Sequence, residues 1–113
     1  MHRVEIERGG PAGAAVVHLH GEVDAFVAPE LSAAFAELAG QGRVVADLTA
    51  VGFLDSTALG LLVRGVRELT EAGGEVRVVL PRGTARRIFE ITALDRVLPV
   101  AESRSAALAE LAG

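Results

Sequence analysis

Cysteine, tryptophan and tyrosine are absent from this 113-residue sequence, and phenylalanine occurs only four times. Without cysteine the chain has no disulfide, no zinc site built on thiolates and no cysteine nucleophile. With so few aromatic residues, the hydrophobic half of the sequence must pack through valine, leucine, isoleucine and alanine. A chain of this length can form one hydrophobic core, so we expect a single domain spanning residues 1–113.

The sequence also lacks an excess of positive charge. Eleven basic residues stand against fifteen acidic ones, for a net charge of −4. Because binding to nucleic acid relies on basic side chains that displace counterions from phosphates, direct contact with nucleic acid is not expected. No apolar run approaches the ~20 residues of a membrane-spanning helix, and the alternating start of the chain does not resemble a signal peptide. We therefore expect a cytoplasmic protein without membrane insertion.

The sequence does contain an alternation of strand and helix patterns. Residues 3–7 and 14–20 alternate apolar and polar side chains around a glycine-rich turn, which predicts a hairpin. Further strands are expected at 43–48, at 75–80 and near 97–100, and helices at about 29–39, from 55 or 56 to 72, after the turn 81–84 and at 103–111. This order predicts an α/β domain with a mixed sheet of four or five strands and about four helices, packed mainly on one face.

Residues 55–60, with the sequence DSTALG, place hydroxyl side chains at the first turn of a helix. An apolar strand and loop over 44–54 precede them, and apolar residues recur at helical spacing from Leu59 onward. Asp55 or Ser56 is the expected N-cap. Free N–H groups and the helix dipole favour an anion at such an end, so the fold should tolerate a phosphoryl group on Ser56. On this segment alone, a simple capping role stays open beside a phosphorylation site.

Four stretches taken together resemble the anti-sigma factor antagonist branch of the STAS domain family. They are GEVDAFVAPEL at 21–31, FLDSTALG at 53–60, GGEVRVV at 73–79 and ARRIFEITALDRVLPV at 85–100. Their order and spacing span nearly the whole chain. The resemblance implies a STAS fold with no enzymatic activity and no cofactor. It also places the phosphorylated serine directly after the aspartate, at Ser56, and ranks Thr57 below it.

The resemblance further implies a partner-switching regulator of transcription. In the family, the unmodified antagonist binds an anti-sigma factor that is also a serine kinase, and so frees a sigma factor. Phosphorylation of the serine breaks that complex, and a serine phosphatase restores it. By the family pattern, the expected partner-binding residues are Gly21, Glu22, Asp24, Asp55, Ser56, Thr57, Ala58 and Leu59. Many members have glycine at the position of Ala58, whose methyl group would limit how closely a kinase approaches.

Two other classes of function stay open. A constitutive STAS adaptor, in a sensory complex or a lipid-transport assembly, would use Ser56 only as a cap. An enzyme or small-molecule binder has the least support, because the sequence contains no G-x-S-x-G elbow and no P-loop. Asp47 and Asp55 bracket an apolar segment without a partnered base, and we expect Asp47 to cap or pair locally.

His18 and His20 lie on the same side of a predicted strand. A metal site would need a third ligand, so solvent-facing histidines are expected and no metal is predicted. Residues 82, 86 and 87 are arginines that form a basic patch, either a solvated helix face or a site for an anionic partner. Gly60 lies inside a predicted helix, where glycine costs ~1 kcal/mol relative to alanine. Close packing on the sheet is the expected reason for it.

Overall fold

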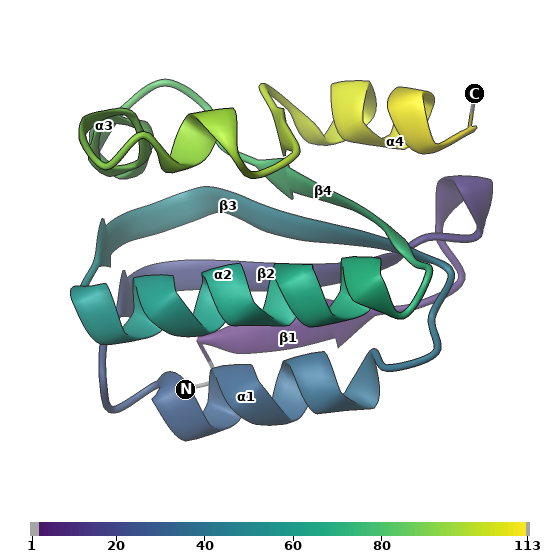
Figure 1. The fold of residues 1–113 in the computed structure, drawn as a ribbon, viewed down its shortest axis with the longest axis horizontal. Helices are drawn as coiled ribbons and strands as arrows, with labels where there is room; N and C mark the ends of the chain where they lie inside the picture. The colour runs from purple at the N-terminus through teal and green to yellow at the C-terminus, as the bar shows by residue number, and fades with distance from the viewer. Residues whose placement is uncertain (1–2, 113) are drawn as a thin grey trace.

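The predicted N-terminal hairpin forms one edge of a five-stranded sheet (Figure 1). The computed structural model describes residues 3–112. Its strands are β1 (Val4–Glu7), β2 (Ala15–Val23), β3 (Arg43–Leu54), β4 (Glu75–Val79) and β5 (Val100–Ala101). Its α-helices are α1 (Ala28–Glu37), α2 (Ser56–Glu71), α3 (Thr84–Ile91) and α4 (Arg104–Ala112), and short 3-10 helices are η1 (Pro11–Gly13) and η2 (Leu94–Arg96).

The strands lie side by side in the order in which the chain makes them. β1 and β2 are antiparallel, with Val4 opposite Leu19, and the remaining neighbours are parallel. Parallel neighbours need a crossover connection, which α1 supplies between β2 and β3 and α2 supplies between β3 and β4. The predicted α/β fold with a mixed sheet and four helices is confirmed.

The helices cover both faces of the sheet, whereas the sequence predicted mainly one. Figure 1 shows α1 and α2 side by side, with α4 across the sheet from them. On α4, Ala107 and Leu111 are buried in a separate core cluster with Val16, Val45 and Val79. Successive residues of β3 and β4 are buried, and strands that are apolar on both sides are typical of parallel sheets covered on both faces. That pattern is the physical reason for the correction.

Strand β3 continues through residues 49–54, which were predicted to form a loop. It can do so because β2 also runs on to Val23, which pairs with Leu54. By contrast, the last residue of β3 that pairs with β4 is Asp47. Residues 20–23 and 50–54, here called the β2–β3 extension, therefore carry the start of α2 beyond the main part of the sheet.

Helix α2 packs on α1 through Gly65 and not through Gly60. Gly65 is buried, and a Cβ added there would lie 2.6 Å from ring atoms of Phe35 on α1. Gly60 is exposed, and a Cβ added there would meet no atom within 4 Å, so the predicted packing role of Gly60 is wrong. The contact between the two helices requires a glycine five positions further along the chain.

The longest helix, α2, has 16 residues. Within residues 3–112, no helix has both the length and the apolar character needed to cross a membrane.

Candidate functional site

Asp55 is the N-cap of α2, and it also fastens a second segment of the chain. Its Oδ1 accepts a hydrogen bond from the backbone N–H of Ala58 at 2.9 Å, the bond expected of a cap. Its Oδ2 accepts from the backbone N–H of Ala25 at 3.0 Å, in the loop between β2 and α1. Of the two predicted caps, Asp55 is therefore the one that the structure has. One carboxylate holds the first turn of α2 and the β2–α1 loop together.

The loop of residues 24–27 is a hydrogen-bonded turn that displays Phe26. Oδ1 of Asp24 accepts from the N–H of Phe26 at 3.0 Å, and the carbonyl of Asp24 accepts from the N–H of Val27 at 3.0 Å. The following side chain, Val27, is buried, whereas Phe26 is 94% exposed. Phe26 thus buries almost no apolar surface within the chain. Backbone hydrogen bonds, and not side-chain packing, set its position.

The structure brings the two groups of predicted site residues to one end of the β2–β3 extension. The carbonyl of Val23 accepts from the N–H of Asp55 at 3.2 Å, which places residues 21–24 next to the start of α2. Ser56, Thr57 and Glu22 are exposed, and Asp24 is half-buried. The predicted surface is therefore continuous, although its two parts are about thirty positions apart in the sequence.

Gly21 has a backbone that favours glycine, with φ at +73°. A Cβ added there would collide with the guanidinium group of Arg3, which donates to the carbonyl of Glu22 at 3.3 Å. Gly21 thus allows Arg3 to cross the β2–β3 extension. Gly21 contributes to the site by letting the Arg3 side chain pass close to its backbone.

Ala58 and Leu59 differ from the other predicted partner-binding residues. Ala58 is fully buried, and Leu59 is half-buried against the main core. The side chain of Ala58 is therefore closed to a partner, and its methyl group does not limit the approach of a kinase. Helical periodicity explains this correction, because position 58 lies on the same face as the buried Leu62 and Val66.

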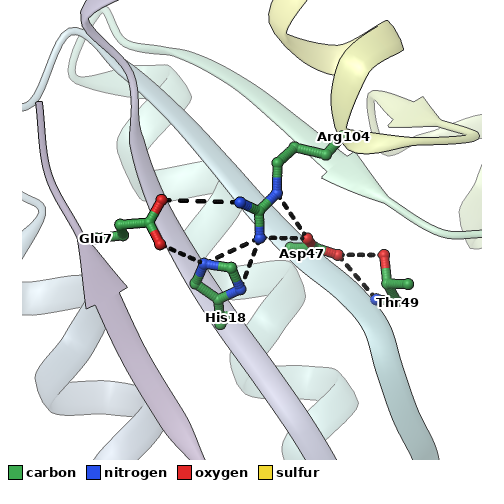
Figure 2. Close-up of polar contacts among 5 residues, drawn as sticks. All are labelled: Glu7, His18, Asp47, Thr49 and Arg104. Carbon is green, nitrogen blue, oxygen red and sulfur yellow. Dashed lines mark hydrogen bonds and ion pairs between the residues drawn. The ribbon is translucent and has the colours of Figure 1, made fainter. Parts of the chain in front are cut away.

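A second polar cluster lies on the face of the sheet that carries α4 (Figure 2). It contains Glu7, His18, Asp47, Thr49 and Arg104. Asp47 is only 6% exposed, and its Oδ1 accepts from both the N–H and the hydroxyl of Thr49. Its Oδ2 accepts from Nε of Arg104 at 3.1 Å and from Nη2 at 3.0 Å. The predicted local pairing of Asp47 is confirmed, but Arg104, 57 positions away, has no sequence signal that links it to this strand.

The pKa of Asp47 lies below its ordinary value of 3.8. Burial alone would raise this pKa, but hydrogen bonds from Thr49 and Arg104, and the positive charge of Arg104, together lower it by more. Asp47 therefore stays ionised and joins α4 to the sheet.

His18 belongs to this cluster and is therefore only partly open to solvent, whereas the sequence predicted a solvent-facing histidine. Its ring is 25% exposed, with Nε2 at 3.3 Å from Glu7 and with Nη2 of Arg104 at 2.8 and 3.0 Å from the two ring nitrogens. His20 is half-buried, 4.0 Å from Glu5. Across residues 3–112, no group of three or more histidine or acidic side chains is placed to hold a metal ion.

Two surface hollows lie away from Ser56. One, of about 870 Å³, covers the Asp47 cluster, whose charged groups already pair with one another. The other is lined by the predicted arginine patch together with Glu90 and Glu102, so its charge is mixed. Within that patch, Arg86 donates to the carbonyl of Leu80 at 2.8 Å and supports the turn before α3. Neither hollow is lined by Ser56 or Asp55. We therefore assign the candidate site to the start of α2 and the 24–27 loop, which Asp55 joins.

The order and arrangement of the elements are shared with known proteins. Residues 5–107 match the STAS domain family. The chain belongs to the STAS family. An anti-sigma-B factor antagonist of Listeria monocytogenes is 30% identical to this STAS domain over 86 residues, which cover 74% of this chain and 75% of the relative.

Solved structures share the fold of this STAS domain. An anti-sigma factor antagonist from Mycobacterium paratuberculosis superposes with a TM-score of 0.85 at 29% identity, covering 97% of this chain and 93% of that one. The Bacillus cell fate determinant SpoIIAA in its phosphorylated form superposes with a TM-score of 0.71 at 22% identity, covering 96% and 98%. The predicted STAS resemblance is confirmed. STAS anti-sigma factor antagonists are non-enzymatic regulators, in agreement with the prediction of no enzymatic activity.

Proposed function

We propose that this STAS domain is an anti-sigma factor antagonist that works by partner switching. In its unphosphorylated form it binds an anti-sigma factor with serine kinase activity. Phosphorylation of Ser56 releases that partner, and a serine phosphatase reverses the modification. Relatives at 30% and 31% identity that are named anti-sigma-B factor antagonists support this proposal. We further propose that residues 1–113 act as one STAS domain in the cytoplasm.

The observation that carries the proposal is that Asp55, and not Ser56, caps α2. Ser56 is exposed, and its hydroxyl forms no hydrogen bond with the part of the chain from residue 3 to 112. The alternative of a constitutive adaptor gave Ser56 the role of a cap. Since Asp55 fills that role, the exposed hydroxyl of Ser56 is free for modification.

The position of Ser56 suits a reversible switch. A phosphoryl group brings a charge of about −1.5 to −2, which the N-terminal dipole of α2 favours, so the fold should remain intact. In a protein interface, however, a desolvated and unpaired phosphate costs several kcal/mol. A loss of ~3 kcal/mol weakens binding roughly a hundredfold, which is enough to exchange partners.

The test is capture from a lysate of the native host, with mass spectrometry of the retained proteins. The baits are wild type, Ser56→Ala, Ser56→Asp and the control Ser105→Asp, which alters an exposed serine in the first turn of another helix, α4. We expect all baits except Ser56→Asp to retain a kinase-like anti-sigma factor. With that partner purified, calorimetry should show binding about a hundredfold weaker for Ser56→Asp.

Identical capture by all four baits would contradict the switch and favour the constitutive adaptor. Thr57 is exposed in the same turn, so the modified residue must also be assigned. When the captured kinase is incubated with labelled ATP, Ser56→Ala should abolish incorporation of phosphate and Thr57→Ala should not.

A further inference from the structure

Phe26 is an exposed aromatic side chain on the loop that Asp55 joins to the start of α2. At 94% exposed, it is more open than Phe53, which is 47% exposed on the β2–β3 extension. Aromatic residues that enter a pocket on the partner carry much of the binding free energy in protein interfaces. A ring that the fold itself does not use, on the loop that Asp55 holds against the start of α2, fits that role.

The position of Phe26 depends on Asp55. The N–H of Ala25, the residue before Phe26, donates to Oδ2 of Asp55 at 3.0 Å, while Oδ1 of the same carboxylate caps α2. Asp24 fixes only the local turn, through its bond to the N–H of Phe26. Asp55 is therefore the side chain through which the first turn of α2 holds the loop.

A phosphoryl group on Ser56 would compete with this arrangement. It would stand next to the Asp55 carboxylate and repel it, and its oxygens would accept from the same free N–H groups that begin α2. If Asp55 turns away, the N–H of Ala25 loses its acceptor. The loop would then hold Phe26 less firmly.

The charges of the surface leave room for a mechanism within this chain beside repulsion by the partner. The surface around Ser56 already carries the carboxylates of Glu22, Asp24 and Asp55. A partner that binds this acidic surface is already compatible with negative charge. The added phosphate charge weakens the complex by repulsion and desolvation, and loss of an ordered aromatic anchor is a second cause, which lies within this chain.

Building on the proposed function, we propose that Phe26 is the apolar anchor for the anti-sigma factor and that Asp55 is the residue that positions it. Phosphorylation of Ser56 then acts in part by releasing the 24–27 loop. The matching surface on the anti-sigma factor is an apolar pocket that receives one aromatic ring beside the start of α2.

The first experiment measures the loop without any partner. Chymotrypsin cleavage after Phe26 and hydrogen exchange of the Ala25 amide both report opening of the loop. Mass spectrometry of the fragments separates cleavage after Phe26 from cleavage after Phe53, which is also exposed, whereas Phe35 and Phe89 are buried. Asp55→Ser keeps a capping oxygen for Ala58 but lacks the second oxygen that holds Ala25. Loss of one hydrogen bond of ~1 kcal/mol corresponds to cleavage and exchange about fivefold faster. Phosphoserine installed at position 56 during expression should have the same effect, and phosphoserine at the control position 105 should have none.

The second experiment uses the anti-sigma factor captured by wild type. Phe26→Ala should weaken binding at least about tenfold, because anchor residues cost more than ~1.4 kcal/mol when truncated. The control Val97→Ala, which truncates another exposed apolar residue (72% exposed), should bind like wild type.

Unchanged cleavage and exchange in both Asp55→Ser and the protein phosphorylated at Ser56 would overturn the release of the loop, even where capture still depends on phosphate. Wild-type affinity of Phe26→Ala would overturn the anchor. If no bait captures an anti-sigma factor, the proposed function fails, while the cleavage measurement still decides whether Asp55 and phosphate control the loop.

Discussion

Asp47 and Asp55 lie eight positions apart in the sequence, yet the structure uses them in opposite ways. Asp47 is buried and accepts hydrogen bonds from the charged Arg104 and from Thr49. Asp55 is half-buried and accepts only backbone N–H groups, from Ala25 and Ala58. A buried carboxylate needs a charged partner to offset its desolvation, whereas one at a helix start is satisfied by free N–H groups. Asp47 therefore serves stability, and Asp55 can serve a switch.

The two aspartates also differ in what they join. Asp47 ties helix α4 to the middle of the sheet, so loss of its partner Arg104 should destabilise the whole fold. Asp55 ties one short loop to the first turn of α2, so losing one of its bonds opens only that loop. Four substitutions or conditions test this contrast, beginning with the largest effect.

Arg104→Met should have the largest effect on stability. It leaves the buried carboxylate of Asp47 without its charged partner, at a cost of about 2–3 kcal/mol, less than for a fully buried pair because the side chain of Arg104 is 37% exposed. Urea unfolding followed by far-UV circular dichroism measures the change. The control Arg77→Met breaks the ion pair with Glu110, which also joins the sheet to α4, and should cost less than ~1 kcal/mol. Equal losses in the two variants would show that Asp47 is no more critical than a surface pair.

Asp55→Ala should cost about 1–2 kcal/mol, because it removes the cap of α2 and the bond to Ala25 together. Asp55→Ser should recover most of the capping part, so the difference between the two variants separates the cap from the loop. The same urea titration measures both. If Asp55→Ser is as unstable as Asp55→Ala, the cap does not account for the loss.

Acid should reduce the difference between wild type and Arg104→Met. Because the pKa of Asp47 is lowered in the folded state, its contribution to stability is fully present above its ordinary pKa of 3.8 and is lost as the pH falls through the folded-state value. Protonated Asp47 no longer pairs with Arg104 as an ion. Unfolding free energies measured from about pH 6 to about pH 2 should therefore converge, and a constant difference would exclude the charge of Asp47 as its cause.

Ser56→Ala should have the smallest effect, within ~0.5 kcal/mol of wild type, because the side chain is exposed and forms no hydrogen bond with residues 3–112. Its Tm, measured by circular dichroism, should match that of Ser32→Ala, which removes another exposed helical hydroxyl, on α1. A loss above ~1 kcal/mol would restore a capping role to Ser56 and weaken the contrast with Asp55.

Local patterns in the sequence determined much of this protein. Alternation over 3–7 and 14–20 predicted the hairpin, and apolar spacing after Asp55 predicted α2 and its cap, because a strand face and a helix cap depend on neighbours only a few positions away. The four STAS stretches also identified the family.

Only the tertiary structure decided which distant residues meet. The bond from Ala25 to Asp55 joins residues 30 positions apart, and the pairing of Asp47 with Arg104 joins residues 57 positions apart. The contact with Phe35 that requires glycine at position 65 also joins residues 30 positions apart. The β2–β3 extension likewise exists only because each strand continues alongside the other. Contacts of this kind depend on the packing of whole elements, and no local periodicity in the sequence records them.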